Sequence, residues 1–211
     1  MPYEPTDVVT SEAEIRVHVD GIHDAQKLKV LDHIDTHCQV WIQRSPFIVI
    51  STVDQHGNLD ASPKGDPAGF VKVVDAQTLA IPDRPGNHRF DSFTNILATG
   101  KIGIIFLVPN RNEVVRVNGH AQIVRDLPLR ETMAIKGRIP EFAILVRVQE
   151  AFYHCGKAII RSQLWKPELA ASTQGLPTYA EALHAQGKCD LSFAEIDARL
   201  RHNDKNRLYD E

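Results

Sequence analysis

The stretch EVVRVNGHAQIVRD, residues 113–126, alternates apolar and polar side chains, and so does EFAILVRVQEAFYHC, residues 141–155. A two-residue period is typical of β-strands that bury one face. Both stretches therefore predict long strands that bound a hydrophobic core. The residues expected on the buried faces are Val115, Val117, Gly119, Ala121 and Ile123 in the first strand, and Phe142, Ile144, Val146, Val148 and Phe152 in the second.

Four further apolar runs predict strands outside these two. They are PFIVISTV (46–53), AGFVKVV (68–74), TLAI (78–81) and KIGIIFLV (101–108). Hairpins or short crossovers can join the resulting six strands, which favours an antiparallel barrel over a βαβ array. The sequence contains no GxGxxG or GxxxxGK[ST] loop, which argues against Rossmann and P-loop proteins.

Helices are predicted around this β region. A capping-box spacing from Ser11 to Glu14 predicts a short first helix. Apolar residues at three- and four-residue steps predict one amphipathic helix over 24–44. We expect a single domain over residues 1–211, with N-terminal helices at about 11–44 and a C-terminal helical tail at about 167–211. The other helices expected are 91–99, ended by Gly100, 128–136, and one through Phe193, Ile196 and Leu200.

Composition narrows the class of protein. The net charge of −3 gives no basic field that would attract nucleic acid. No apolar stretch approaches the roughly 18 residues of a membrane span, and the N-terminus lacks a signal-peptide pattern. Cys38, Cys155 and Cys189 are widely spaced and odd in number, which argues against a disulfide framework. We therefore expect a cytoplasmic protein that binds neither membrane nor nucleic acid.

The densest cluster of polar groups is IPDRPGNHRFDS, residues 81–92. Arg84, Asn87, His88 and Arg89 lie within six positions, directly before the expected start of a helix. Guanidinium groups, amides and helix N-termini all donate hydrogen bonds to phosphate oxygens. The segment therefore indicates a phosphate site, with a solvated polar turn as the alternative.

Three other features each allow a functional and a structural interpretation. Lys64 in DASPKGD could add a positive charge for an anion, or protect an exposed strand edge. His154 and Cys155 could form a nucleophilic pair, but neighbouring residues of a strand point to opposite faces, which favours a packed cysteine. His33 and His37 have a zinc-binding spacing, yet no third ligand is evident, and a helix-surface or dimer-facing role is favoured.

Several of these strings, taken together, resemble a known family: the FMN-binding split-barrel proteins related to pyridoxamine 5′-phosphate oxidase. The resemblance implies a mainly β fold with peripheral helices, built on a six-stranded antiparallel split β-barrel. It also implies a homodimer that binds FMN at the subunit interface. The strings that carry it are KVLDHIDTHCQVWI, SPFIVISTVDQHGNLDASPKGDPAGFV, LAIPDRPGNHRFDSFTNIL, IGIIFLVP, VRVNGHAQI and FYHCGKAIIRSQLW.

The resemblance also assigns cofactor-binding residues by position. One group would address the phosphate and ribityl chain, a pair would lie close to the flavin ring, and a neighbouring strand would add an arginine. Three further residues would approach the ring from the second chain. The residues at the phosphate and ribityl chain would be Lys64, Asp83, Arg84, Asn87 and Arg89, and the pair at the ring would be Ser62 and Pro63. The arginine of the neighbouring strand would be Arg116, and the residues from the second chain would be Lys157, Arg161 and Trp165.

The chain departs from true pyridoxamine phosphate oxidases in two places. ASPKGD stands where those enzymes have a basic strand, and the tail after RSQLWKP lacks their C-terminal arginine motif. The resemblance therefore implies an FMN-dependent oxidoreductase acting on an unidentified small molecule, with NAD(P)H as a candidate donor and no residue assigned as catalytic. A non-catalytic flavin-binding or sensing protein, a split barrel using heme or deazaflavin, and a structural dimer remain alternatives.

Overall fold

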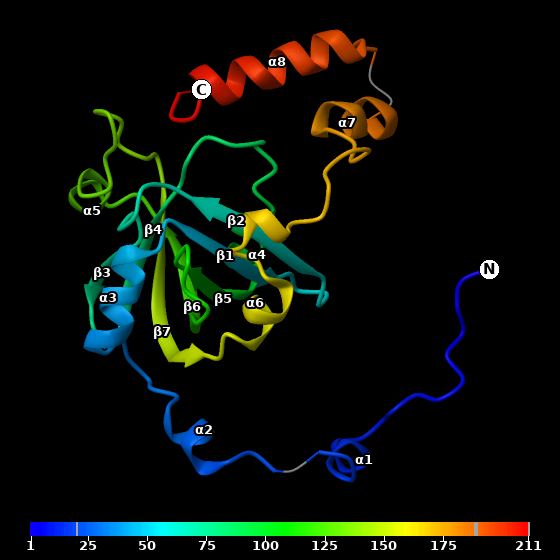
Figure 1. Ribbon diagram of the computed structural model, residues 1–211. Helices are drawn as coiled ribbons and strands as arrows, with labels where there is room; N and C mark the ends of the chain where they lie inside the picture. Colours follow the sequence, from blue (N-terminus) through cyan, green and yellow to red (C-terminus); the bar gives the residue numbers. More distant parts are fainter. Residues whose placement is uncertain (20, 188–189, 211) are drawn as a thin grey trace.

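In a computed structural model of the chain, described for residues 1–19, 21–187 and 190–210, seven strands form one antiparallel sheet. The order is β2-β1-β5-β6-β7-β4-β3, so β2 and β3 are the sheet edges. The sheet curls around its buried face (Figure 1), which is consistent with a split barrel. The strands are β1 Phe47–Val53, β2 Leu59–Gly65, β3 Lys72–Asp75, β4 Thr78–Pro82, β5 Lys101–Leu107, β6 Val114–Val124 and β7 Ala143–His154.

The sheet has seven strands where six were predicted, and β2 accounts for the difference. Its sequence, LDASPKG, has little β-propensity and contains a proline. It pairs with β1 as an edge strand, and Pro63 lies opposite Val49. An edge strand accepts proline because only one of its sides needs N–H donors. Pairing with β1, and not the intrinsic β-propensity of its residues, therefore makes this segment a strand.

The long hairpin of β6 and β7 confirms most of the predicted alternation. Val115, Val117 and Ala121 are buried on β6, as are Ile144, Val146 and Val148 on β7. The prediction is wrong for Phe152, because the register shifts between Asn118 and Gly119. This bulge moves Ala151 to the buried face and Phe152 to the outer one. At the bulge the strands approach so closely that a Cβ on Gly119 would collide with the carbonyl of Arg147.

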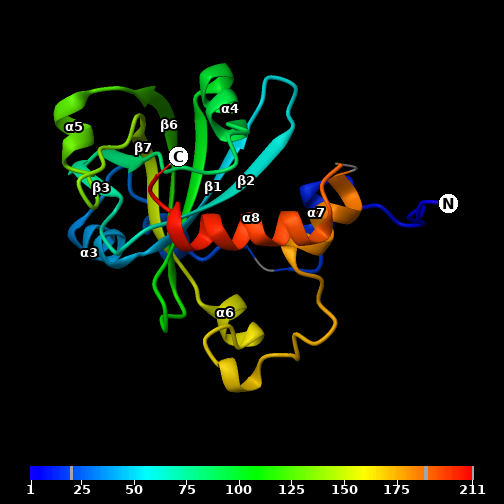
Figure 2. The ribbon, with the colours of Figure 1, turned by 90° about the horizontal axis from the view of Figure 1, so that it is seen from above.

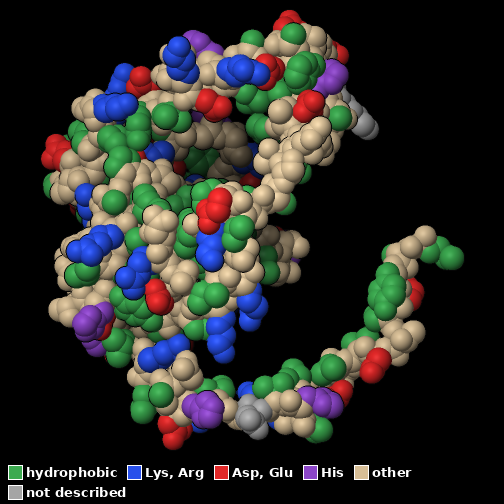
Figure 3. Space-filling model, in the orientation of Figure 1, with side chains coloured by type: hydrophobic (Ala, Val, Ile, Leu, Met, Phe, Trp, Pro, Cys, Tyr) green, Lys and Arg blue, Asp and Glu red, His purple; other side chains and the backbone are tan. Residues whose placement is uncertain are grey.

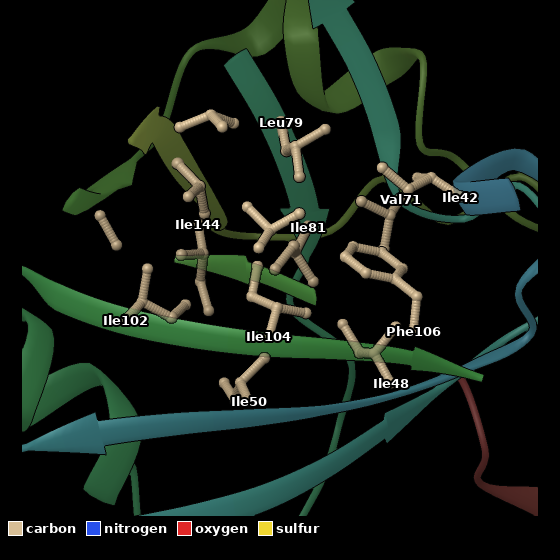
Figure 4. Close-up of a cluster of buried hydrophobic side chains, with 14 of the residues drawn as sticks. Ile42, Ile48, Ile50, Val71, Leu79, Ile81, Ile102, Ile104, Phe106 and Ile144 are labelled. Carbon is tan, nitrogen blue, oxygen red and sulfur yellow. The ribbon is translucent and has the colours of Figure 1, made fainter. Parts of the chain in front are cut away.

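The core lies inside the curled sheet. Figure 4 shows isoleucine side chains of β1, β4, β5 and β7 pointing toward one another, with Phe106 among them. Phe106, Ile48 and Ile81 are fully buried. Burial of such side chains is the main contribution to stability, at about 1.5–3 kcal/mol each. The core therefore stabilises the sheet, including β1, with which the edge strand β2 pairs.

The helices match the prediction closely at two places. Helix α4 (Asp91–Thr99) ends at Gly100 in the left-handed conformation, and α1 (Glu12–Arg16) begins after Ser11, whose side chain accepts from the Glu14 N–H. Helix α8 (Phe193–Asn206) contains the predicted apolar spacing. Helix α5 (Leu127–Glu131) ends earlier than predicted. Further helices towards the C-terminus are α6 Lys157–Ser162, the 3-10 turn Pro167–Leu169 and α7 Tyr179–Gly187.

The single helix predicted over 24–44 is two helices, α2 (Asp24–Leu28) and α3 (Thr36–Arg44). Between them Leu31 forms an antiparallel bridge to Ala151 of β7, with N–O distances of 3.0 and 2.8 Å. Asp35 then starts α3 by accepting from the Cys38 N–H at 2.8 Å. The hydrogen bonds between Leu31 and β7 therefore interrupt the helix that the spacing of the apolar residues predicts.

The two ends of the chain lie outside the barrel. The N-terminal segment with α1 extends away from it, and α8 crosses it as an arm, with a hollow beneath the arm (Figures 1 to 3). Figure 2 shows α4 and α6 on opposite sides of the molecule. Within the described ranges, no helix is long and apolar enough to cross a membrane.

Thiol reactivity should distinguish the buried Cys38 from the exposed Cys155. Burial raises the pKa of the Cys38 thiol to about 12, whereas Cys155 is exposed; both are free, and Cys189 lies outside the described residues. Because the thiolate is the reactive form, we expect one thiol, Cys155, to react with an aromatic disulfide reagent at pH 8 in a Cys189→Ser background. Cys38 should react only after unfolding. Two fast-reacting thiols in the native protein would contradict the burial of Cys38.

Candidate functional site

A pocket of about 240 Å³ lies where β2, the loop after β4 and the start of α4 meet. We call it the α4 pocket. It brings together seven of the residues expected at a cofactor site, from two segments about twenty residues apart in sequence. Its lining comprises Asp60, Ala61, Ser62, Pro63, Lys64, Asp83, Arg84, Gly86, Asn87, His88, Arg89, Phe90, Asp91, Ser92 and Phe93.

Strand β2 contributes its inner face to the pocket. Asp60, Ser62 and Lys64 alternate with exposed residues, and they lie opposite buried residues of β1 in the register. Lys64 is half-buried and makes no hydrogen bond or ion pair within the described part of the chain. An ammonium group in this position favours an anionic ligand, because burial without a counter-charge costs free energy.

The loop after β4 turns sharply into α4. His88 and Phe90 have positive φ angles of 59° and 54°, and the Asn87 Oδ1 atom accepts from the Arg89 N–H at 3.1 Å. Phe90 occupies the N-cap position of α4 and offers no side-chain acceptor to the first N–H groups. These groups and the helix dipole therefore remain available to an anion at the pocket.

Arg84 is fixed in the pocket wall. Its Nε atom donates to Oδ2 of Asp66 at 2.6 Å, and its Nη2 atom donates to the carbonyl oxygen of Met133 at 2.8 Å. The Asp66 side chain is only 1% exposed and that of Arg84 17%. The pair is therefore shielded from solvent, and Asp66 determines the orientation of the guanidinium group.

The other charged groups of the pocket are paired more loosely. Arg89 donates to Asp91 at 2.7 Å, but 70% of the Arg89 side chain is exposed, so the pair is weak and Arg89 can turn toward a ligand. The buried Ser92 hydroxyl donates to Asp60 at 2.7 Å and connects α4 to β2. The structure thus provides a pocket with one fixed and two adaptable cations, Arg84, Arg89 and Lys64.

Four of the expected cofactor residues lie outside the α4 pocket. Arg116 is on the outer face of β6, with its Cζ atom 5.1 Å from the centre of the Phe152 ring. Lys157 and Arg161 belong to α6, across the molecule from α4 (Figure 2). The Trp165 indole donates to the Arg111 carbonyl oxygen at 2.7 Å. Within one chain these four residues do not approach the pocket.

The two histidines with zinc spacing are not on one helix face. His33 precedes α3 and contacts Asp32 at 2.8 Å, whereas His37 lies within α3. In the described part of the chain, no three His, Cys, Asp or Glu side chains are grouped so that they could hold a metal ion.

Sequence reasoning missed Asp60, Phe90, Asp66 and Tyr209. The two-residue period of β2 could have placed Asp60 beside Ser62 and Lys64. Tyr209 donates to Oδ1 of Asp66 at 2.8 Å, a contact across 143 residues that no local pattern signals.

The curled antiparallel sheet, with a pocket lined by charged residues beside its edge strand, is consistent with a split-barrel protein. A family model described as pyridoxamine 5′-phosphate oxidase matches residues 34–155, more than half of the chain. The chain therefore belongs to the pyridoxamine 5′-phosphate oxidase family, and the resemblance seen in the sequence is confirmed. No curated protein matches the chain in sequence.

Several solved structures are similar to this chain. HupZ of Group A Streptococcus is 22% identical, with a TM-score of 0.46, and the match covers 57% of this chain and 93% of HupZ. An FMN-binding protein from Syntrophomonas wolfei is 9% identical, with a TM-score of 0.44 and coverages of 67% and 95%. General Stress Protein 26 from Bacillus anthracis is 15% identical, with a TM-score of 0.42 and coverages of 54% and 88%.

Proposed function

We propose that the α4 pocket binds the phosphate of FMN and that the protein is a homodimeric, FMN-dependent oxidoreductase acting on a small molecule. The observation that carries the proposal is the convergence of Lys64, Arg84 and Arg89 on the N-terminus of a nine-residue helix. This set of donors suits a dianionic phosphate. Family membership supports a flavin as the molecule that carries it.

The size of the pocket limits what one chain can hold. Ligand sites that enclose drug-sized molecules have volumes of roughly 300–1,000 Å³, and the α4 pocket has about 240 Å³. The phosphate and part of the ribityl chain fit there, next to Asp83, Asn87 and Lys64. The flavin ring would then lie along Ser62 and Pro63, where a second surface must cover it.

A second copy of the chain is the surface that we propose. The outer face of β1 and β5 carries an apolar patch in which Phe47 lies beside Leu107 and Val49 beside Ile105. Phe47 and Ile105 are 42% and 39% exposed in one chain. We call these four residues the outer patch. In the proposed dimer, Lys157, Arg161 and Trp165 of the partner subunit approach the ring, as the family resemblance implies.

The chemistry follows from this division of roles. FMN would supply two-electron transfer, and the chain would bind, orient and electrostatically tune it. Lys64, Arg84 and Arg89 would hold the phosphate, and Ser62 and Pro63 would support the ring. Because Arg116 does not approach the pocket of its own chain, Arg116 of the partner subunit would be the positive group that favours the reduced, anionic form. Neither a nucleophilic side chain nor a metal site enters the proposal.

An absorption spectrum and two titrations test the cofactor. We expect FMN binding with a flavin spectrum and weaker binding of riboflavin, which lacks the phosphate. Rapid reduction of the bound flavin by NAD(P)H would support the enzyme over a non-catalytic flavin-binding protein. A Soret band without flavin would instead identify a heme protein, and a preference for deazaflavin would exclude FMN as the resident cofactor.

Lys64→Ala tests the pocket itself. We expect the Kd for FMN to rise about tenfold or more, because a hydrogen bond to a charged group contributes roughly 1.5–3 kcal/mol. The Kd for riboflavin should stay unchanged, since Lys64 would address only the phosphate. Lys27→Ala, which removes an exposed lysine of α2, is the matched control. Equal FMN affinities of the Lys64 variant and the wild type would refute the assignment of the phosphate to this pocket.

A further inference from the structure

The C-terminal end of the chain returns to the wall of the α4 pocket. After α8, the Tyr209 hydroxyl donates to Oδ1 of Asp66 at 2.8 Å, and the Tyr209 ring lies 5.1 Å from the Nζ atom of Lys136. Asp210 pairs with Arg138 at 2.8 Å. Two neighbouring residues are thus anchored to the body of the protein, which makes this a defined contact of the tail.

Asp66 connects this tail to Arg84. Each carboxylate oxygen of Asp66 accepts one side-chain hydrogen bond: Oδ1 from Tyr209 and Oδ2 from Arg84. The hydrogen bond to Asp66 raises the pKa of the Tyr209 hydroxyl, so the hydroxyl stays protonated and remains a donor. A carboxylate that is only 1% exposed depends on both partners, because an unsatisfied buried acceptor costs about 1–3 kcal/mol.

Arg84 donates only one hydrogen bond to Asp66. Arginine and carboxylate groups commonly form two parallel hydrogen bonds. Here the Tyr209 hydroxyl donates to Oδ1, and Arg84 uses only its Nε atom on Asp66 while Nη2 donates to the Met133 carbonyl oxygen. Its Nη1 atom is left without a hydrogen-bond partner among the described residues.

We propose that Tyr209 is a positioning residue of the phosphate site: by donating to Oδ1 of Asp66 it holds Arg84 in the orientation in which Nη2 binds the Met133 carbonyl oxygen and Nη1 remains for the ligand. This inference rests on the proposed binding of FMN phosphate in the α4 pocket. Without the Tyr209 hydroxyl, Oδ1 of Asp66 lacks a donor in a buried place. The guanidinium of Arg84 then rotates to supply it and withdraws from the pocket.

The test compares FMN with riboflavin in the full-length protein. Tyr209→Phe keeps the ring beside Arg84 and Lys136 and removes only the hydroxyl. We expect the Kd for FMN to rise about three- to tenfold, in line with the loss of one hydrogen bond to a charged group, and the Kd for riboflavin to stay the same. In an Arg84→Lys background, which lacks the guanidinium group, Tyr209→Phe should not change the Kd for FMN further. Tyr179→Phe, at a tyrosine that is 68% exposed on α7, is the matched control.

Each result decides between clear alternatives. A selective loss of FMN affinity that disappears in the Arg84→Lys background supports the positioning role. An unchanged Kd for FMN, or equal losses for FMN and riboflavin, overturns it, since a merely structural tail would act on both flavins alike. A wild-type protein that binds both flavins equally well overturns the phosphate site itself and this inference with it.

Discussion

Asp66→Ala should lower the free energy of unfolding by about 3 kcal/mol or more, because it leaves the guanidinium of Arg84 without its counter-charge. The Asp66 side chain is 1% exposed and that of Arg84 17%, so water cannot replace the lost contact easily. The Tyr209 hydroxyl loses its acceptor in the same variant. Urea denaturation followed by circular dichroism measures the change.

Two comparison variants separate this effect from the loss of any carboxylate. Asp24→Ala breaks a 3.7 Å pair with Lys27, whose side chains are 90% and 61% exposed, and should cost less than about 1 kcal/mol. The double variant Asp66→Ala, Arg84→Met removes both charges and should recover part of the lost stability. If Asp66→Ala costs no more than Asp24→Ala, Asp66 does not hold Arg84 as described.

Ile105→Arg should convert the proposed dimer to monomers and abolish tight FMN binding. Ile105 is in the outer patch, and its neighbour across the strands on β6 is Arg116, so the new charge meets like charges on the same face. Burying such a charge in a dimer would cost several kcal/mol. The fold should survive, because the side chain points away from the core. Analytical ultracentrifugation and FMN titration measure the two effects.

The matched control for this variant is Leu127→Arg in α5, where an exposed leucine lies outside the outer patch. It should leave both the oligomeric state and the FMN affinity unchanged. A wild-type protein that is monomeric at micromolar concentration would contradict the dimer. An Ile105→Arg monomer with full FMN affinity would show that one chain completes the site alone.

Local sequence signals already group part of the residues that line the α4 pocket. The cluster at 81–92 contains its own turn, its arginines and the start of α4, and these features depend on residues close together in the chain. Only the family resemblance assigns Lys64 to the site, since the local sequence DASPKGD by itself favours an edge lysine. Pairing of β2 with β1 places it on the inner face, opposite Ile48 and beside the α4 pocket.

The sequence by itself determined the strands with a strict two-residue period, helix α4 with its stop at Gly100, and the membership of the family. These depend on local backbone preferences and on which side chains avoid water. Only the tertiary structure decided the seventh strand, the break between α2 and α3, and the outward position of Phe152. Each of these depends on hydrogen bonds to another strand of the sheet, which local backbone preferences do not encode. The same holds for Asp66, which joins Arg84 and Tyr209 into one contact although 143 residues separate Asp66 from Tyr209.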